Sequence, residues 1–207
     1  MTKTRVAVLI SGRGSNMMSL VEAAACADYP AEIGLVLSNR PDAAGLQFAS
    51  DHGIATDCVD HKTFPDREAF EIALDSAIRK HDIDLVCLAG FMRLLTPWFV
   101  DRWHDRLINI HPALLPSYKG LDTHARALTD GVTLHGCTVH YVRAEMDAGP
   151  IIGQAAVPVL TDDTESSLAK RVLAQEHKLY PEALARVASG QLDQQTDLDQ
   201  SCLRVLR

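Results

Sequence analysis

The sequence lacks the features that would mark a membrane or nucleic-acid-binding protein. None of its apolar runs reaches the roughly 18 residues of a membrane span, and it has no block of basic residues. Its formal charge is −7 at pH 7. An acidic chain without a basic patch argues against nucleic acid or an anionic membrane as the main partner. We therefore expect small-molecule substrates, no nucleic acid and no membrane.

Cysteine pairs, repeats and low-complexity segments are also missing. The five cysteines are scattered and contain no C-x-x-C pair. An odd, dispersed set favours reduced, mostly buried thiols in a cytoplasmic protein. The apolar run at residues 6–10 is too short and too early for a signal peptide. With 207 residues, 47% of them apolar, the chain suffices for one domain, which we expect over residues 1–190, with a polar, peripheral tail at 191–207.

Short apolar runs alternate with segments of helical periodicity in the first half of the chain. Runs such as 5–10 and 85–89 are nearly all apolar, as expected of strands covered on both faces of a parallel sheet. This alternation predicts a doubly wound, mostly parallel, Rossmann-like α/β sheet. The predicted strands are 5–10, 33–37, 54–59, 85–89 and 106–110, and the predicted helices are 17–27, 42–52 and 66–81.

The second half has a different pattern. Two prolines and one glycine within nine residues (Pro112, Pro116 and Gly120) predict an ordered loop or lid at 112–124, followed by a short helix at 125–129. Residues 135–142 alternate in the way typical of a strand near a sheet edge, and 151–159 would pair with them as an antiparallel hairpin. Residues 163–189 predict a long helix with Pro181 as a candidate kink.

A glycine-rich segment, residues 11–16, directly follows the first predicted strand. Such a turn before a helix exposes backbone N–H groups at the positive helix end, which favours an anion. Met17 replaces the third glycine of a dinucleotide fingerprint, and no G-K-[ST] follows. The segment therefore predicts a site for one compact phosphate. The alternative is a tight turn capped by Ser15 or Asn16.

Asn109 and His111 alternate with two isoleucines at the end of the strand 106–110, which Pro112 terminates. Both polar side chains should therefore leave one face of the strand, at the carboxyl end where α/β sheets bind ligands. An amide beside an imidazole suits a carbonyl whose oxygen becomes negative. The alternative is a polar strand end satisfied by loop backbone.

Asp147 is the candidate partner of His111. If its carboxylate lies beside the imidazole, it favours the charged ring, raises the His111 pKa and orients the ring as an acid. An acid in a loop flanked by glycine can also be only a turn former. The apolar loop 91–97 poses a similar choice, because it suits either a pocket for a flat ligand or the packing of a short helical turn.

Metal and serine-hydrolase sites fit the sequence less well. His111, His124, His135 and His140 follow no compact metal-binding spacing, and no H-E-x-x-H motif is present. The segment around Ser15 falls short of a G-x-S-x-G nucleophile elbow. We expect no metal.

Five motifs occur together and in order. They are Ser11-Gly12-x-Gly14-Ser15-Asn16, Leu88-Ala89-Gly90-Phe91-Met92-Arg93, Asn109-Ile110-His111-Pro112-x-Leu114-Leu115-Pro116, Met146-Asp147-x-Gly149-Pro150-Ile151 and Gln175-Glu176-His177-x-x-Tyr180-Pro181. Over about residues 4–190 the chain closely resembles the phosphoribosylglycinamide formyltransferases, a family of folate-dependent enzymes of purine synthesis. The Asn-x-His and Asp set alone marks the wider group of 10-formyltetrahydrofolate transferases and hydrolases.

The resemblance implies transfer of the formyl group of 10-formyltetrahydrofolate, a co-substrate, to the amine of 5'-phosphoribosylglycinamide. Asn109 would hold the formyl oxygen, His111 would stabilise the oxyanion and assist proton transfer, and Asp147 would raise the His111 pKa. The N-terminal half would bind the ribonucleotide phosphate and the C-terminal half the folate. The implied ribonucleotide residues are Gly14, Ser15, Asn16 and Glu176. The implied folate residues are Arg67, Met92, Arg93, Leu94, Leu95, Asn109, Arg143, Ala144, Glu145, Met146 and Asp147.

Three alternatives remain beside this expectation. A tRNA formyltransferase would need a further C-terminal nucleic-acid-binding domain, and a formyltetrahydrofolate hydrolase usually has an N-terminal regulatory domain. A catalytically silent nucleotide-binding module is the third alternative. Lys119 departs from the proline or arginine found in many relatives, which leaves its role open. The sequence is compatible with a monomer or a homodimer.

Overall fold

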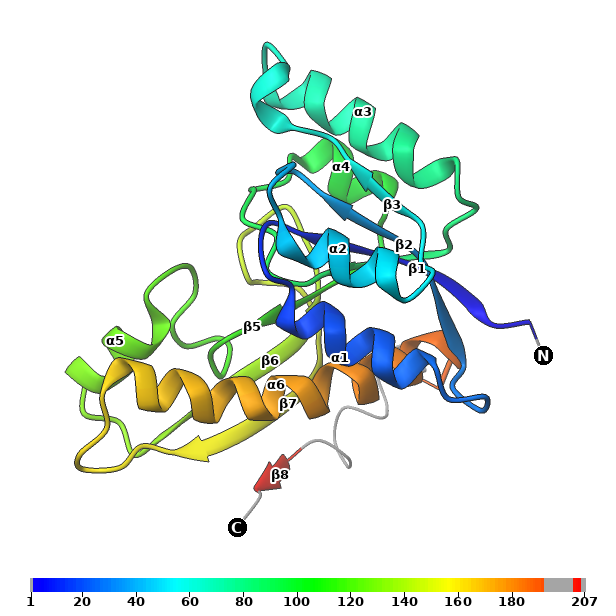
Figure 1. The fold of residues 1–207 in the computed structure, drawn as a ribbon. Coiled ribbons are helices and arrows are strands. Elements are labelled where there is room, and N and C mark those ends of the chain that lie inside the picture. Colours follow the sequence, from blue (N-terminus) through cyan, green and yellow to red (C-terminus); the bar gives the residue numbers. More distant parts are fainter. Residues whose placement is uncertain (1, 192–202, 206–207) are drawn as a thin grey trace. The chain divides into compact units, whose positions relative to one another are not determined.

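The computed structural model describes residues 2–191 and 203–205. The chain divides after Asn109 into two compact units (Figure 1). The predicted single domain over residues 1–190 stays a prediction, and most of the predicted tail at 191–207 lies outside the described residues. Within the described part of the chain, no helix combines the length and the apolarity needed to cross a bilayer.

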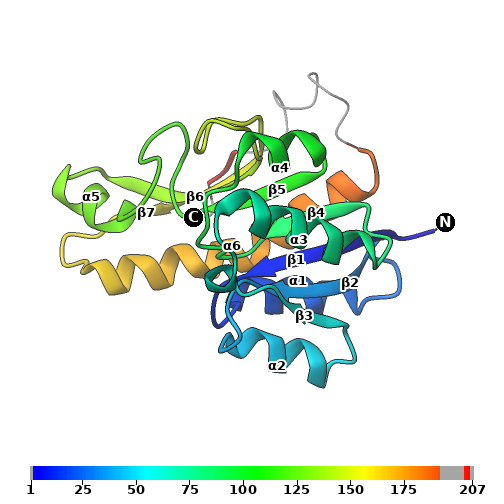
Figure 2. The same ribbon diagram turned by 90° about the horizontal axis from the view of Figure 1, so that it is seen from above.

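The first unit is built on parallel strands in the order β3-β2-β1-β4-β5, which can be followed in Figure 2. These strands are β1 (Thr4–Ile10), β2 (Ala31–Ser38), β3 (Thr56–Cys58), β4 (Leu85–Leu88) and β5 (Leu107–His111), the last of which crosses into the second unit. Residues 6–10 of β1 are fully buried, as their apolar run predicts. Because β1 pairs with β2 on one side and β4 on the other, the strand order reverses beside it, and such points favour ligand binding at the carboxyl ends.

Helices cover both faces of this first sheet, with α1 and α2 on one side and α3 and α4 on the other (Figure 1). The helical elements are α1 (Ser15–Ala24), α2 (Ala44–Asp51), the 3-10 helix η1 (His61–Thr63), α3 (Arg67–Arg79) and α4 (Pro97–Arg102). The Asp66 side chain accepts from the N–H of Ala69 at 2.8 Å and so caps α3. The six-residue α4 is absent from our predictions, because it is too short for a periodicity signal.

The second unit contains the antiparallel hairpin of β6 (Leu134–Tyr141) and β7 (Ile151–Pro158), with β8 (Leu203–Val205) parallel to β7. Its helices are α5 (Thr123–Thr129) and the long α6 (Glu165–Ala188). α6 packs on the hairpin through a buried cluster that includes Cys137, Val157 and Leu168. The doubly wound, mostly parallel α/β fold with a C-terminal hairpin and long helix is thus confirmed.

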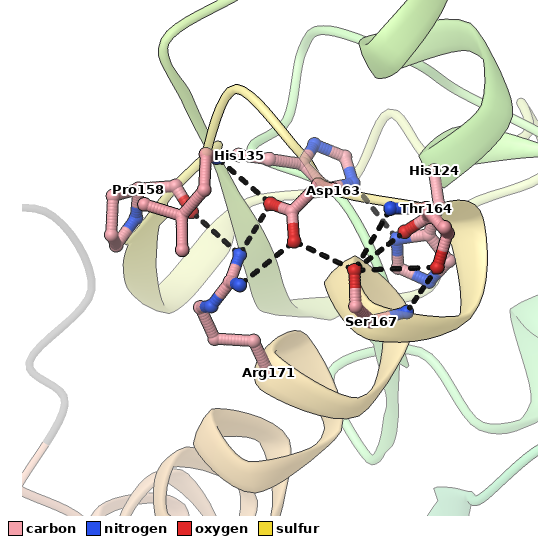
Figure 3. A network of polar contacts seen from close by, with 8 residues as sticks. His124, His135, Pro158, Asp163, Thr164, Ser167 and Arg171 are labelled. Carbon is pink, nitrogen blue, oxygen red and sulfur yellow. Dashed lines mark hydrogen bonds and ion pairs between the residues drawn. The ribbon is translucent and has the colours of Figure 1, made fainter.

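A polar network begins α6 (Figure 3). Thr164 and Ser167 form a capping box, and the two terminal guanidinium nitrogens of Arg171, Nη1 and Nη2, donate to Asp163 at 2.6 and 2.8 Å. These hydrogen bonds hold the pKa of the Asp163 carboxyl well below its usual range. α6 then runs through Pro181 without a break.

Two details differ from the sequence-based expectations or extend them. Residues 135–140 of β6 are all buried, which the alternation of residue types did not indicate, because alternation does not reveal that both faces of a strand are covered. Four cysteines lie within the described residues and carry free thiols, of which Cys87 and Cys137 are buried. Cys202 lies outside the described residues.

Candidate functional site

His111 lies at the carboxyl end of β5 and is 5% exposed. Its Nε2 donates to the backbone carbonyl oxygen of Tyr118 at 2.9 Å. Because a carbonyl oxygen only accepts, this contact places a proton on Nε2 and leaves Nδ1 as the basic nitrogen of the neutral ring. Asn109, two residues earlier, is only partly buried. The structure therefore leaves Nδ1 as the nitrogen of His111 that is available for acid–base chemistry.

Asp147 lies beside that nitrogen. Its Oδ2 is 3.4 Å from Nδ1 of His111 and accepts the backbone N–H of Gly120 at 2.8 Å. The Asp147 side chain is 11% exposed, so its charge is little screened by solvent. The predicted proximity of Asp147 and His111 is therefore present in the structure.

His140 is a third member of this group that the sequence analysis considered only as a metal candidate. It lies near the end of β6, is 2% exposed, and places its Nε2 3.7 Å from Oδ1 of Asp147. Its Nδ1 donates to the backbone carbonyl oxygen of Tyr141 at 2.9 Å. Burial lowers the pKa of His140, an effect that Tyr141 and Asp147 oppose only in part. Hereafter His111, Asp147 and His140 are called the imidazole–carboxylate cluster.

The loop between β5 and α5 is ordered, as predicted. The Thr138 hydroxyl donates to the carbonyl oxygen of Ala113 at 2.6 Å and accepts from the N–H of Leu115 at 3.0 Å. The Thr123 hydroxyl donates to the carbonyl oxygen of Pro112 at 2.7 Å. These contacts tie both ends of the loop and position the Tyr118 carbonyl that holds His111.

The loop that carries Asp147 is equally constrained. A side chain at Gly149 would put a Cβ 1.7 Å from the carbonyl oxygen of Tyr141, so only glycine fits there. Tyr141 also donates its N–H to the carbonyl oxygen of Pro150 at 2.9 Å. Asp147 has a left-handed backbone with φ 48°, a conformation that aspartate tolerates better than most residues.

The first unit contains a cavity of about 490 Å³ at the carboxyl ends of its strands. It is lined by Ser11, Gly12, Arg13, Gly14, Ser15, Asn16, Asn39, Arg40, His61, Ala89, Gly90, Met92 and Arg93. Gly14 is the N-cap of α1 with φ 73°, and the cap makes no side-chain hydrogen bond. The N-cap is thus neither Ser15 nor Asn16, and the first-turn N–H groups are suited to an anion.

A chain of polar contacts holds three loops around this cavity. The Ser11 hydroxyl donates to Oδ1 of Asn39 at 2.5 Å and accepts the N–H of Met92 at 2.8 Å. Nδ1 of His61 lies 2.9 Å from the carbonyl oxygen of Asn39. The sequence analysis missed Asn39 and His61, although the position of Asn39 directly after β2 was a usable signal.

Two further histidines face each other in the second unit. Nδ1 of His124 lies 3.1 Å from Nε2 of His135, near the start of α6 (Figure 3). Burial lowers the pKa of His135 to about 4, helped by the neighbouring His124. Residues 2–191 and 203–205 contain no group of three or more His, Cys, Asp or Glu side chains arranged to hold a metal ion.

The chain is similar in sequence to known formyl transferases. The family model "Formyl transferase" matches residues 4–184. The chain belongs to the formyl transferase family. The phosphoribosylglycinamide formyltransferase of Escherichia coli K12 is 44% identical over 187 residues, which cover 90% of this chain and 88% of that protein. The human trifunctional purine biosynthetic protein adenosine-3 is 49% identical over 188 residues, or 91% of this chain, but the match spans only 19% of the human protein.

Solved structures of formyl transferases agree with this membership. The phosphoribosylglycinamide formyltransferase of Brucella melitensis is 49% identical, has a TM-score of 0.88, and the match covers 91% of this chain and 97% of that one. The corresponding protein of Coxiella burnetii is 46% identical with a TM-score of 0.87, covering 91% of this chain and 89% of that one.

The structure distributes the predicted site residues of this formyl transferase between its two units. Gly14, Ser15 and Asn16 line the first-unit cavity together with Met92 and Arg93, which the resemblance had assigned to folate. Leu94 and Leu95 are not among the cavity-lining residues. Arg67 is exposed at the start of α3.

The remaining predicted residues lie in the second unit. Arg143 stacks its guanidinium 5.8 Å from the Tyr141 ring, and Glu145 lies 3.5 Å from Lys119, so that Lys119 has an ion-pair partner. Ala144 is exposed, as is Met146. Glu176 is buried on α6, 6% exposed.

Proposed function

We propose that this chain transfers the formyl group of 10-formyltetrahydrofolate to the amine of 5'-phosphoribosylglycinamide, a step of de novo purine synthesis, in the cytoplasm. The observation that carries the proposal is the buried pair of His111 and Asp147, with the Tyr118 carbonyl committing Nε2 and leaving Nδ1 to act. Membership of the formyl transferase family, and relatives named phosphoribosylglycinamide formyltransferase over most of their length, support the reaction class.

His111 is the proposed acid and oxyanion stabiliser. In its charged form Nδ1 carries a proton that can be donated to an oxygen or nitrogen that becomes basic during formyl transfer. Asp147, 3.4 Å away, stabilises that charge and keeps the ring in place. Asn109 offers an amide N–H to the formyl oxygen, where negative charge develops.

The ribonucleotide phosphate is assigned to the first-unit cavity. The backbone N–H groups of Gly14, Ser15 and Asn16 lie at the N-cap and in the first turn of α1, at its positive end, and suit a dianionic phosphate. Arg13 and Arg40 line the same cavity. Arg13 adds positive charge there, whereas the Arg40 guanidinium forms an ion pair with Asp42 at 3.1 Å. Glu176 is our candidate for hydrogen bonding to the sugar or glycinamide portion.

10-Formyltetrahydrofolate, when bound, supplies the formyl group, and two sets of residues fit a flat, partly apolar ligand with an acidic tail. In the first unit, Met92 and Leu94 are 71% and 58% exposed, which leaves apolar surface for a ring system. Arg67, Arg93 and Leu95 complete the proposed set there. In the second unit the proposed folate residues are those of the loop 143–147.

A turnover assay with matched omissions tests this function. Purified protein is given 10-formyltetrahydrofolate with and without phosphoribosylglycinamide, and tetrahydrofolate release is followed. Release that requires the ribonucleotide supports the transferase. Release without it would assign the protein to hydrolysis, and no release in either mixture, with both ligands bound, would leave a binding module.

A further inference from the structure

The imidazole–carboxylate cluster contains a donor–acceptor conflict that identifies a further role. His140 must donate from Nδ1, because the Tyr141 carbonyl oxygen only accepts. In its neutral form it therefore presents a lone pair at Nε2 to Oδ1 of an ionised Asp147, 3.7 Å away. Two acceptors at that distance repel each other. The contact becomes an ion pair when His140 binds a second proton.

The contacts of Asp147 follow this polarity. Oδ2 accepts the N–H of Gly120 and lies nearest to His111, whereas Oδ1 is the oxygen nearest to His140. When His140 is neutral, the Asp147 carboxylate is thus favoured to accept hydrogen bonds through Oδ2, the oxygen nearest to His111. A charged His140 draws the same carboxylate toward Oδ1 and away from His111.

The backbone places His140 in this position through an irregularity in the hairpin. The pairing of β6 with β7 shifts between Val139 and His140, so that Val139 lies opposite Gly153 and His140 opposite Ile151. Such bulges re-aim a side chain and occur often beside active sites. The missing Cβ at Gly149 lets the Asp147 loop approach the Tyr141 carbonyl that holds the His140 ring.

We propose that His140 is a positioning residue for Asp147, and that a charged His140 competes with His111 for the same carboxylate. The inference rests on the proposed formyl transfer, in which the His111–Asp147 pair is catalytic. The titratable groups whose charges act on His140 are Asp147, from the loop after β6, and His111, at the end of β5.

Two variants separate positioning from titration. His140→Asn keeps an N–H donor for the Tyr141 carbonyl but leaves no group facing Asp147. His140→Gln places an amide near the position of the His140 Nε2, and this amide does not titrate. We expect His140→Asn to lower kcat about tenfold, since small misplacements of catalytic groups are costly. KM for both substrates should stay within about twofold because His140 is assigned no substrate contact. His140→Gln should recover kcat to within about threefold.

The pH dependence of kcat is the measurement that distinguishes this role from a purely structural one, which would not change it. In the wild type, kcat should show an inflection on the acid side, below the ordinary histidine range, where His140 becomes charged. That inflection should be absent from both variants. His52→Asn is the matched control, because His52 makes the same kind of contact, Nδ1 to the Phe48 carbonyl at 2.8 Å, yet is exposed. Wild-type kcat in His140→Asn, or an inflection that persists in both variants, would overturn the proposal.

Histidine NMR titration tests the competition without turnover. In the wild type, the His111 ring signal should show an inflection that coincides with that of His140, and His140→Gln should abolish it. Independent titration of the two rings would overturn the inference. Because this measurement needs no substrate, it remains decisive even if the turnover assay rejected formyl transfer.

Discussion

The backbone carbonyl oxygen of Tyr118 accepts the Nε2–H of His111 at 2.9 Å, and this one contact leaves Nδ1 as the ring nitrogen beside Asp147. The two neutral tautomers of a histidine differ in chemistry, because the proton donor and the proton acceptor exchange places on the ring. Here the loop after β5 removes that choice, and Asp147 acts on the nitrogen that remains.

Replacing His111 should abolish most turnover without unfolding the protein. We expect His111→Ala to lower kcat by about 10²-fold or more, the scale of a general acid–base group. Steady-state kinetics measures this loss, and a melting curve checks the fold. His52→Ala, which changes an exposed histidine outside the cluster, should retain wild-type kcat. An unchanged kcat in His111→Ala would refute its role.

Asp147→Asn tests the charge of the carboxylate at nearly constant shape. The amide oxygen can still accept the N–H of Gly120, so the loop should keep its position. The loss of negative charge beside His111 should lower kcat by about tenfold to a hundredfold and move the pH–rate profile. If the profile did not move, the pairing with His111 would have no catalytic meaning.

Gly14→Ala should weaken ribonucleotide binding more than catalysis. Gly14 has φ 73°, and an added Cβ would lie 3.0 Å from the Met17 side chain. The left-handed conformation costs a residue with a Cβ about 1–2 kcal/mol. Gly53→Ala is the matched control, since Gly53 has φ 72° and open space around it. Both variants should lose similar stability in denaturant unfolding, and only Gly14→Ala should raise KM for the ribonucleotide. Equal KM values in the two variants would remove the phosphate from this loop.

Stability should fall on acidification because of His135. Burial lowers its pKa in the folded state to about 4, against about 6.5 for an unfolded chain. The unfolded state therefore binds more protons between these values, so this contribution is complete above about pH 6.5 and is lost as the pH falls toward 4. Unfolding of the wild type and of His135→Gln at several pH values should show a smaller pH dependence in the variant. Parallel curves would contradict the assignment.

Local patterns sufficed for most of the fold and for the central pair. The buried run of β1 and the polarity alternation at Asn109 and His111 are properties of neighbouring residues. They predicted the strands correctly and placed His111 at the end of β5, where the structure brings Asp147 beside it. His140 was missed because a shift in hairpin register brings it to Asp147, and register depends on pairing between distant segments. Asn39 and His61 were missed for a related reason: they meet around a cavity formed by separate loops.

β5 has a further consequence, because the boundary between the two units falls inside it, between Asn109 and Ile110. Asn109 therefore ends the first unit, and His111 is the second residue of the next. Two extended residues span at most about 7 Å, so covalent geometry keeps the Cα atoms of Asn109 and His111 within that distance. A rearrangement at the boundary would leave these two Cα atoms no farther apart than this. Inserting a single residue at Ile110, in contrast, would turn the two side chains to opposite faces of the strand.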